Sequence, residues 1–197
     1  MKFSAVILAG GRSQRMGSDK AWLAVEGKPL VARQIELVRA LGAEEVLISG
    51  RSEVDYSSLN CRVLQDRVPD AGPLAGIESA LSAISTPLLL VLAVDLARMT
   101  PSLLQLLLTH CRQNCGAVPR FDKNIEPLAA VYPRAALGIA RSQLDGGHYG
   151  ARDFAEQCSV QNLTSFVYLS APHATCFENW NTPADMKTPG PRSSIRV

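Results

Sequence analysis

Apolar residues along the chain follow two periodicities, one typical of buried strands and one typical of helices. Continuous aliphatic runs predict strands at residues 4–8, 45–49, 62–65 and 88–94, and the last run is the most uniformly apolar. Between these runs, apolar positions recur with helical spacing at residues 29–41, 74–84 and 101–113. The last helix has an N-cap signal in Thr100, followed by Pro101 at the first helical position. Strands that alternate with helices predict an α/β fold with a parallel or mostly parallel sheet.

The second half of the chain has a less regular pattern. It predicts short strands at residues 117–118 and 128–132, and the polar turn between them is compatible with one antiparallel strand. Helices follow at residues 134–144 and 151–158, and a last strand at 166–169. From residue 187 the chain is rich in Pro, Ser and Arg without periodicity, which is typical of disorder. We therefore expect one domain over residues 1–186 and a disordered tail over residues 187–197.

Composition narrows the class of protein. A chain of 197 residues with 47% hydrophobic and 19% charged residues suits one ordered domain. Its net charge of +2 is too small to indicate nucleic acid or an anionic membrane as a partner. No apolar run approaches the roughly 20 residues that span a bilayer. The start of the chain leaves no room for a signal peptide, and the 5 cysteines are scattered, so we expect a cytoplasmic protein.

The loop after the first strand carries the strongest chemical signal. The aliphatic run stops at Gly10 and Gly11, and the polar residues that follow include Arg12, Arg15 and Lys20. Glycine lets backbone N–H groups approach a phosphate closely, while Arg and Lys supply positive charge. Two glycines after a strand are also a common turn. Cationic side chains in a glycine loop after a first strand suit a triphosphate, so we interpret this segment as the nucleotide-holding loop of a transferase. Its spacing matches neither the P-loop nor the Rossmann dinucleotide fingerprint, which opposes P-loop kinases and Rossmann dehydrogenases.

Polar residues follow several of the predicted strands. In an open parallel sheet, the carboxyl ends of the strands border one crevice. Ser49, Asp66 and Asp95 would join the glycine loop at that crevice. Because a carboxylate after a long apolar strand is costly to bury without a cation, Asp95 is a candidate Mg²⁺ ligand. The alternatives are that Asp95 caps the next helix and that Asp66 only starts a turn.

Five motifs, in order along residues 4–185, resemble those of the MobA-like nucleotidyltransferases, the family of molybdenum cofactor guanylyltransferases. They are Leu8-Ala9-Gly10-Gly11 with Arg15-Met16-Gly17 and Asp19-Lys20, Asp66 leading into Gly72-Pro73-Leu74-Ala75-Gly76, Val94-Asp95, Glu126-Pro127-Leu128 through Tyr132, and Asn179-Trp180-Asn181-Thr182-Pro183. The resemblance implies a single-domain, Rossmann-like three-layer sandwich of the nucleotide-diphospho-sugar transferase type. It also implies transfer of GMP from GTP to molybdopterin or Mo-molybdopterin with Mg²⁺, and partner proteins that deliver or receive the cofactor.

The resemblance also assigns roles to individual residues. Those assigned to the nucleotide are Leu8, Ala9, Gly10, Gly11, Lys20, Ser49, Asp66 and Asp95. Those assigned to catalysis are Arg15, Lys20 and Asp95, with Asp95 as the Mg²⁺ ligand, and those assigned to the second substrate are Asn179 and Asn181. Arg152, which follows the glycine-rich loop at residues 145–150, is a further candidate contact to the phosphate of the second substrate. Asparagine can donate and accept hydrogen bonds, as pterin recognition requires, although an Asn-Thr-Pro sequence can also cap a helix.

Two positions depart from the family pattern. Asp95 is followed by Leu96 and Ala97 where the family usually has Asp-x-Pro, and Ser49 stands where it often has asparagine. These departures are the support for one alternative, a non-catalytic nucleotide-binding protein, which the presence of Lys20 and Asp95 opposes. A second alternative is a cytidylyltransferase of the same fold that acts on molybdopterin or a small alcohol phosphate. The Leu-Ala-Gly-Gly sequence favours the guanylyl branch.

Overall fold

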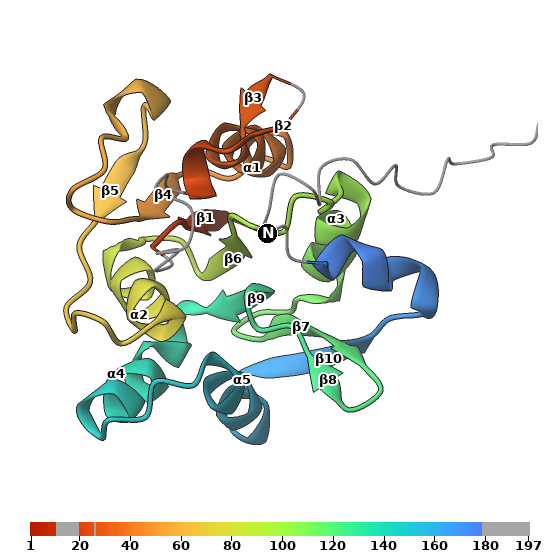
Figure 1. The fold of residues 1–197 in the computed structure, drawn as a ribbon. Coiled ribbons are helices and arrows are strands. Elements are labelled where there is room, and N and C mark those ends of the chain that lie inside the picture. Colours follow the sequence, from red (N-terminus) through yellow and green to blue (C-terminus); the bar gives the residue numbers. More distant parts are fainter. Residues whose placement is uncertain (11–19, 26, 179–197) are drawn as a thin grey trace, which may run out of the picture.

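One mixed sheet forms the centre of the molecule (Figure 1). The computed structural model describes residues 1–10, 20–25 and 27–178. Within them the strand order is β10-β7-β9-β6-β1-β4-β5. The strand bounds are β1 Phe3–Leu8, β4 Val46–Ser49, β5 Arg62–Leu64, β6 Leu88–Ala93, β7 Gly116–Phe121, β9 Ala129–Pro133 and β10 Thr164–Tyr168. All neighbours along this path are parallel except β9, which runs antiparallel to β6 and β7.

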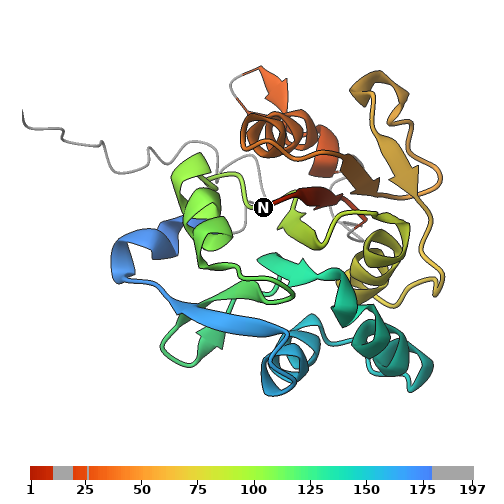
Figure 2. The same ribbon diagram turned by 180° about the vertical axis from the view of Figure 1, so that it is seen from behind.

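Helices cover both faces of the sheet and give a three-layer arrangement (Figures 1 and 2). One face carries α1 (Leu30–Ala40) and α3 (Pro101–His110), and the other carries α2 (Pro73–Ala83), α4 (Leu137–Asp145) and α5 (Ala151–Val160). Short 3-10 segments lie at η1 (Lys20–Trp22), η2 (Ser57–Leu59), η3 (Arg134–Ala136) and η4 (Ala171–Phe177). The predicted α/β class with a mostly parallel sheet is therefore confirmed.

The sheet separates two hydrophobic cores. Because successive side chains of a strand point to opposite faces, Ala5 and Ile7 of β1 join the core under α1 and α3. Val6 and Leu8 join the core under α2, α4 and α5. Every residue of β1 and β6 is buried, which explains why both strands appear in the sequence as unbroken apolar runs.

The sequence-based elements agree with the structure most closely where the apolar pattern is strong. The hydroxyl of Thr100 accepts a hydrogen bond from the N–H of Leu103, as expected of an N-cap, but α3 ends at His110 rather than near residue 113. Strand β7 runs to Phe121, well beyond the predicted residues 117–118. The sequence pattern missed β8 (Asn124–Ile125) and the hairpin of β2 (Ala24–Val25) and β3 (Lys28–Pro29), since two-residue strands are too short to show a periodicity.

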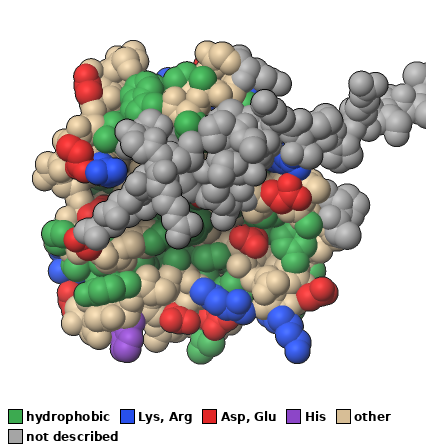
Figure 3. Space-filling model, viewed as in Figure 1, with side chains coloured by type: hydrophobic (Ala, Val, Ile, Leu, Met, Phe, Trp, Pro, Cys, Tyr) green, Lys and Arg blue, Asp and Glu red, His purple; other side chains and the backbone are tan. Residues whose placement is uncertain are grey.

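Charged side chains of both signs are mixed over the face seen in Figure 3, outside the grey residues. No large patch of one sign appears there. Within the described residues, no helix is both long enough and apolar enough to cross a bilayer. The predicted tail from residue 187 lies outside the described residues.

A buried carboxylate on α2 connects this helix to α4 and to the loop between β5 and α2. The side chain of Glu78, on α2, is 2% exposed and receives a 2.8 Å bond from Nε of Arg141 on α4. Its second oxygen lies 3.7 Å from Nε of Arg67, whose Nη2 contacts Asp145 at 2.9 Å. Arg67 directly follows Asp66, so this cluster fastens the start of the β5–α2 loop to α2 and α4.

We expect Arg141→Met to lower the free energy of unfolding by about 2–3 kcal/mol, because it leaves a buried carboxylate without its closest partner. Glu78→Gln should cost less, since both arginines are about half exposed and keep their hydration. Urea denaturation measures both variants. Lys2→Met, which breaks the exposed pair of Lys2 with Glu44, is the control and should show no measurable change. Equal losses for Arg141→Met and Lys2→Met would contradict this interpretation.

Candidate active site

A pocket of about 1140 Å³ opens where the parallel strands end. In the sheet register, Leu8 lies beside Ser49 on one side and Ala93 on the other, and Ser49 lies beside Leu64. The chain adds β4 and β5 on one side of β1 and then returns to place β6 on the other side. The strand order therefore reverses at β1, the position where ligands bind in open α/β sheets.

Backbone hydrogen bonds hold the loops together at the end of β1. The N–H of Ala9 donates to the carbonyl of Ser49 at 2.8 Å, and the N–H of Val94 donates to the carbonyl of Leu8 at 3.1 Å. Gly10 follows and lines the pocket. Among the described residues, a Cβ added at Gly10 would meet the carbonyl oxygen of Ser49 alone, at 3.9 Å, an ordinary contact. This part of the chain therefore leaves room for a side chain at Gly10, and the glycine keeps the surface open on the pocket side.

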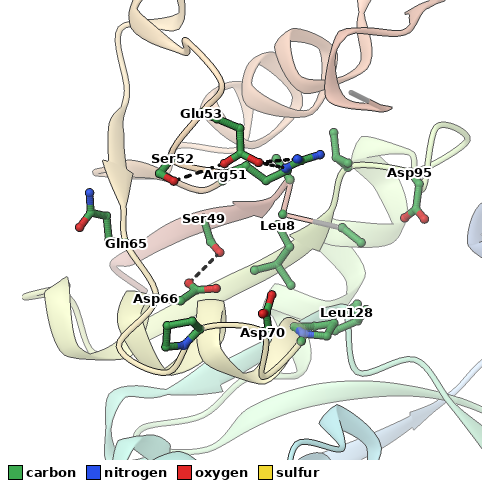
Figure 4. Close-up of a pocket in the computed structure, with 18 residues that line it drawn as sticks. Leu8, Ser49, Arg51, Ser52, Glu53, Gln65, Asp66, Asp70, Asp95 and Leu128 are labelled. Carbon is green, nitrogen blue, oxygen red and sulfur yellow. Dashed lines mark hydrogen bonds and ion pairs between the residues drawn. The ribbon is translucent and has the colours of Figure 1, made fainter. Parts of the chain in front are cut away.

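Ser49 and Asp66 form a pair on one side of the pocket (Figure 4). The hydroxyl of Ser49 donates to Oδ1 of Asp66 at 3.3 Å. Ser49 is buried against Gly76 of α2, where an added Cβ would lie 2.3 Å from the serine oxygen. Burial raises the pKa of Asp66, the serine hydrogen bond opposes this rise, and the negative charge of Glu78 adds to it. The fold thus holds a carboxyl in a site where its charged form is costly.

Asp95 lies in the turn after β6, on the side of the pocket away from the Ser49–Asp66 pair (Figure 4). It is partly exposed to the pocket. No group of three or more His, Cys, Asp and Glu side chains gathers as a metal site within the described residues. One carboxylate is enough for Mg²⁺, which takes its other ligands from water and substrate phosphates, so the residues present fit that ion.

The pocket also contains residues to which the sequence analysis assigned no individual role, although Gly72 and Pro73 belong to its second motif. Gly72, at a φ of 68°, and Pro73 begin α2 at the pocket wall, where the positive end of a helix favours anions. Arg51 and Glu53 form an ion pair at the rim, with 2.7 Å between Nε and the carboxylate. Asp70, in the left-handed region at a φ of 60°, lines the same space. Loop residues show no periodicity that would identify them from the sequence. In the loop from Asp66 to Pro73, the glycine and proline residues were the only sign of an ordered conformation.

The Pro127-Leu128 motif supports the wall of the pocket. The hydroxyl of Tyr132 donates to the carbonyl of Pro127 at 2.9 Å. The N–H of Ala93 donates to the carbonyl of Leu128 at 2.8 Å, and Leu128 lines the pocket. This motif thus joins β9 to the end of β6, next to Asp95.

Several predicted site residues are not tested by this geometry. Gly11, Arg15, Asn179, Asn181 and the side chain of Lys20 lie outside the described part of the chain, so their roles stay predictions. Arg152 is described but does not line the pocket. Its guanidinium donates to Glu156 at 3.1 Å and to the carbonyl of Lys123 at 2.8 Å. Its role toward a second substrate stays a prediction without support from this pocket.

Thiol and imidazole chemistry finds no support among the described residues that line the pocket, which include neither cysteine nor histidine. All 5 cysteines are free thiols. Burial raises the pKa of Cys111 and of Cys158 to about 12, so both thiols are protonated at neutral pH. The ring Nδ1 of His110, beside Cys111, lies 2.8 Å from the carbonyl of Leu106.

Relatives of known name resemble the chain over most of its length. It is 37% identical to "Probable molybdenum cofactor guanylyltransferase" of Opitutus terrae over 92% of each protein. It is 34% identical to "Molybdenum cofactor guanylyltransferase" of Xanthomonas euvesicatoria pv. vesicatoria, over 92% of this chain and 90% of the relative.

Solved structures support the same fold. Molybdopterin-guanine dinucleotide biosynthesis protein A from Archaeoglobus fulgidus has a TM-score of 0.69 and 23% identity, over 93% of this chain and 95% of its own. The 2-C-methyl-D-erythritol 4-phosphate cytidylyltransferase of Thermus thermophilus has a TM-score of 0.67 and 18% identity, over 92% of this chain and 94% of its own. At these sequence identities, the two structures support the fold of this chain and nothing about its function.

The family model for the MobA-like NTP transferase domain matches residues 5–162. The matched region contains most of β1 together with Ser49, Asp66 and Asp95. It therefore includes the polar side chains discussed above that line the pocket. Both the family match and the named relatives lead to one conclusion: this chain belongs to the MobA-like NTP transferase family.

Proposed function

We propose that this protein transfers GMP from GTP to molybdopterin or its molybdenum-bound form, releasing pyrophosphate. The observation that carries the proposal is the pocket at the reversal of strand order, where Gly10, the Ser49–Asp66 pair and Asp95 face one space. Its volume of about 1140 Å³ suits a nucleoside triphosphate with room for part of an acceptor. The names of the relatives point to transfer of a guanylyl group to the molybdenum cofactor, and so to GTP and molybdopterin as the substrates to test first.

The triphosphate binds in this proposal at the end of β1. Gly10 offers backbone without a side chain, and the beginning of α2 adds the positive end of a helix to the lining of the same pocket. Arg15 and Lys20, from the segment after Gly10, supply positive charge to phosphate oxygens.

The carboxylate of Asp95 is the proposed ligand of Mg²⁺. When bound there, Mg²⁺ neutralises charge on the phosphates and orients them. Asp66, held by Ser49, lies at the other side of the pocket, where it can accept a hydrogen bond from the guanine or ribose of the nucleotide. In this proposal, Asp95 binds the metal and Asp66 binds the nucleoside.

The chemical step joins an acceptor phosphate to the α-phosphorus of GTP. A phosphate oxygen of molybdopterin forms the new P–O bond as the bond between the α-phosphorus and the bridging oxygen of the β-phosphate breaks, and pyrophosphate leaves with that electron pair. Because the acceptor phosphate is already anionic at neutral pH, the step needs no catalytic base. The protein contributes alignment and charge neutralisation. Asn179 and Asn181 are the proposed contacts to the acceptor. The proposed location of the protein is the cytoplasm.

Calorimetric titration with GTP, CTP, ATP and UTP, each with Mg²⁺, tests the proposal. We expect selective binding of GTP, and incorporation of GMP when molybdopterin is supplied. Preference for CTP would instead support a cytidylyltransferase of the same fold. If none of the four nucleotides binds to the protein, with or without molybdopterin, the proposal is contradicted.

Gly10→Ala should leave the free energy of unfolding within about 0.5 kcal/mol of wild type, because an added Cβ meets no close atom of the described residues. The affinity for GTP should fall about tenfold or more, because the methyl group occupies space that the phosphates approach. Gly138→Ala is the matched control, on α4 with no atom within 4 Å of its added Cβ. It should stabilise the protein by about 0.5–1 kcal/mol and leave GTP binding unchanged. A destabilised Gly10→Ala variant with normal GTP affinity would contradict the assignment.

Asp66→Asn should make the protein more stable at pH 7 while it weakens GTP binding. Burial raises the pKa of Asp66 in the folded state, so its favourable contribution to folding exists at low pH and is lost as pH rises through that raised pKa. The gain from the variant should therefore shrink as pH falls through that raised pKa, and it should be gone below about 4, near the ordinary pKa of Asp.

Asp55→Asn is the control of opposite sign. Hydrogen bonds from Ser57 lower the pKa of Asp55, including one from the backbone N–H at 2.8 Å. That variant should lose stability at neutral pH and bind GTP normally. Urea denaturation from pH 3 to 8 measures both variants, and a loss of stability in Asp66→Asn at pH 7 would refute the argument.

A further inference from the structure

The turn that carries Asp95 is fixed by several polar contacts. The N–H of Leu96 donates to the carbonyl of Ala93 at 3.4 Å, and the N–H of Met99 donates to the carbonyl of Leu96 at 3.0 Å. The side chains of Leu96 and Met99 are buried, whereas Asp95 is open to the pocket. No proline stiffens the chain from Asp95 to Thr100, so contacts from elsewhere must hold this turn in place.

Gln34 provides such a contact from the middle of α1. Its Nε2 donates to the carbonyl of Leu96 at 2.8 Å, across 62 positions of sequence. The carbonyl of Leu96 thus accepts two hydrogen bonds, from Gln34 and from Met99, which matches its two lone pairs. The backbone immediately after Asp95 is therefore held from both sides of the turn.

The position of Gln34 on its helix is notable because every other buried residue there is apolar. The buried residues of α1 are Leu30, Val31, Gln34, Ile35 and Val38, and Gln34 is 3% exposed. Burying an amide is unfavourable unless it is hydrogen-bonded, and an aliphatic side chain would pack on this face without that cost. Packing alone therefore does not account for a glutamine here, but the bond to the turn does.

Gln34 does not line the main pocket. It borders a separate hollow of about 520 Å³ between α1 and the turn, together with Ala97 and Met99. The side-chain contact of Arg98 with Glu178, at 2.6 Å, is partly exposed to water and so contributes less rigidity. Gln34 is thus a buried anchor of the turn and acts on the pocket only through the backbone next to Asp95.

We propose that Gln34 is a positioning residue that holds the Asp95 carboxylate in the orientation that binds Mg²⁺ with the nucleotide. The inference rests on the proposed role of Asp95. A ligand has to be held within about 0.5 Å of its productive position, and rotation of the backbone at Leu96 would swing the Asp95 side chain. Loss of such a supporting contact lowers metal affinity by about 10–100-fold in other proteins.

The test compares Gln34→Met with Gln143→Met. Methionine keeps the length of glutamine and removes its hydrogen-bonding groups. Gln143, on α4, is also buried, and its Nε2 donates to Gln157 at 2.7 Å, outside the pocket. Calorimetry gives the affinity for GTP with Mg²⁺ and with EDTA, and the ratio of the two affinities measures what the metal adds. Thermal unfolding is recorded for each variant.

We expect Gln34→Met to reduce the Mg²⁺-dependent gain in GTP affinity by about tenfold and to leave the affinity in EDTA unchanged. Gln143→Met should keep the full gain at a similar loss of thermal stability, and Asp95→Asn should abolish the gain. If Gln34→Met and Gln143→Met retain the same gain, Gln34 is only a structural residue and the inference is wrong. If the wild type shows no Mg²⁺-dependent GTP binding, the proposed function itself fails.

A second variant avoids the core. Ala97→Gly loosens the same turn while the contacts of Gln34 stay in place, and it should also reduce the Mg²⁺-dependent gain several-fold, because glycine adds backbone freedom. This variant tests the inference even if Gln34→Met does not fold. An unchanged gain in Ala97→Gly would contradict the dependence of Asp95 on a rigid turn.

Discussion

The pairing of β1 with both β4 and β6 is the constraint on which the rest of the site depends. Each residue from Phe3 to Leu8 is matched with a residue of β6, and the last four are also matched with β4. Both faces of β1 are buried, so a shift of one residue would turn its apolar side chains to the wrong core. With this register fixed, Gly10, Ser49 and Asp95 must emerge at the same edge of the sheet.

Polar groups at the edges of the two cores then determine where the loops lie. Ser49 holds Asp66 and uses the space left by Gly76, Gln34 holds the backbone after Asp95, and Glu78 holds Arg67. Each involves a buried polar atom, which is unfavourable unless its hydrogen bond forms. A loop fastened in this way has few alternative conformations, which a site for a charged substrate requires.

A shared architecture does not by itself identify a nucleotide or an acceptor. The structure from Thermus thermophilus has the same fold at 18% identity, and this likeness concerns the fold alone. In the proposed function, selection of the nucleotide comes from the loops at the strand ends, where the pocket is lined by Ser49, the Arg51–Glu53 pair and residues between Asp66 and Pro73. In the turn after Asp95, where the chain departs from the family pattern, the backbone accepts a hydrogen bond from Gln34 of α1.

The sequence by itself determined the class of fold, because unbroken apolar runs identify strands buried on both faces and helical spacing identifies the helices between them. It also indicated Gly10, Ser49, Asp66 and Asp95 as candidate site residues, since the end of an apolar run marks the end of a strand, and ligands bind at the carboxyl ends of such strands. Only the tertiary structure revealed the contacts of Gln34 with Leu96 and of Glu78 with Arg141, which join residues 62 and 63 positions apart. Neither contact leaves a local pattern, because a buried polar residue on a helix looks like an interruption of its apolar face until its partner is seen.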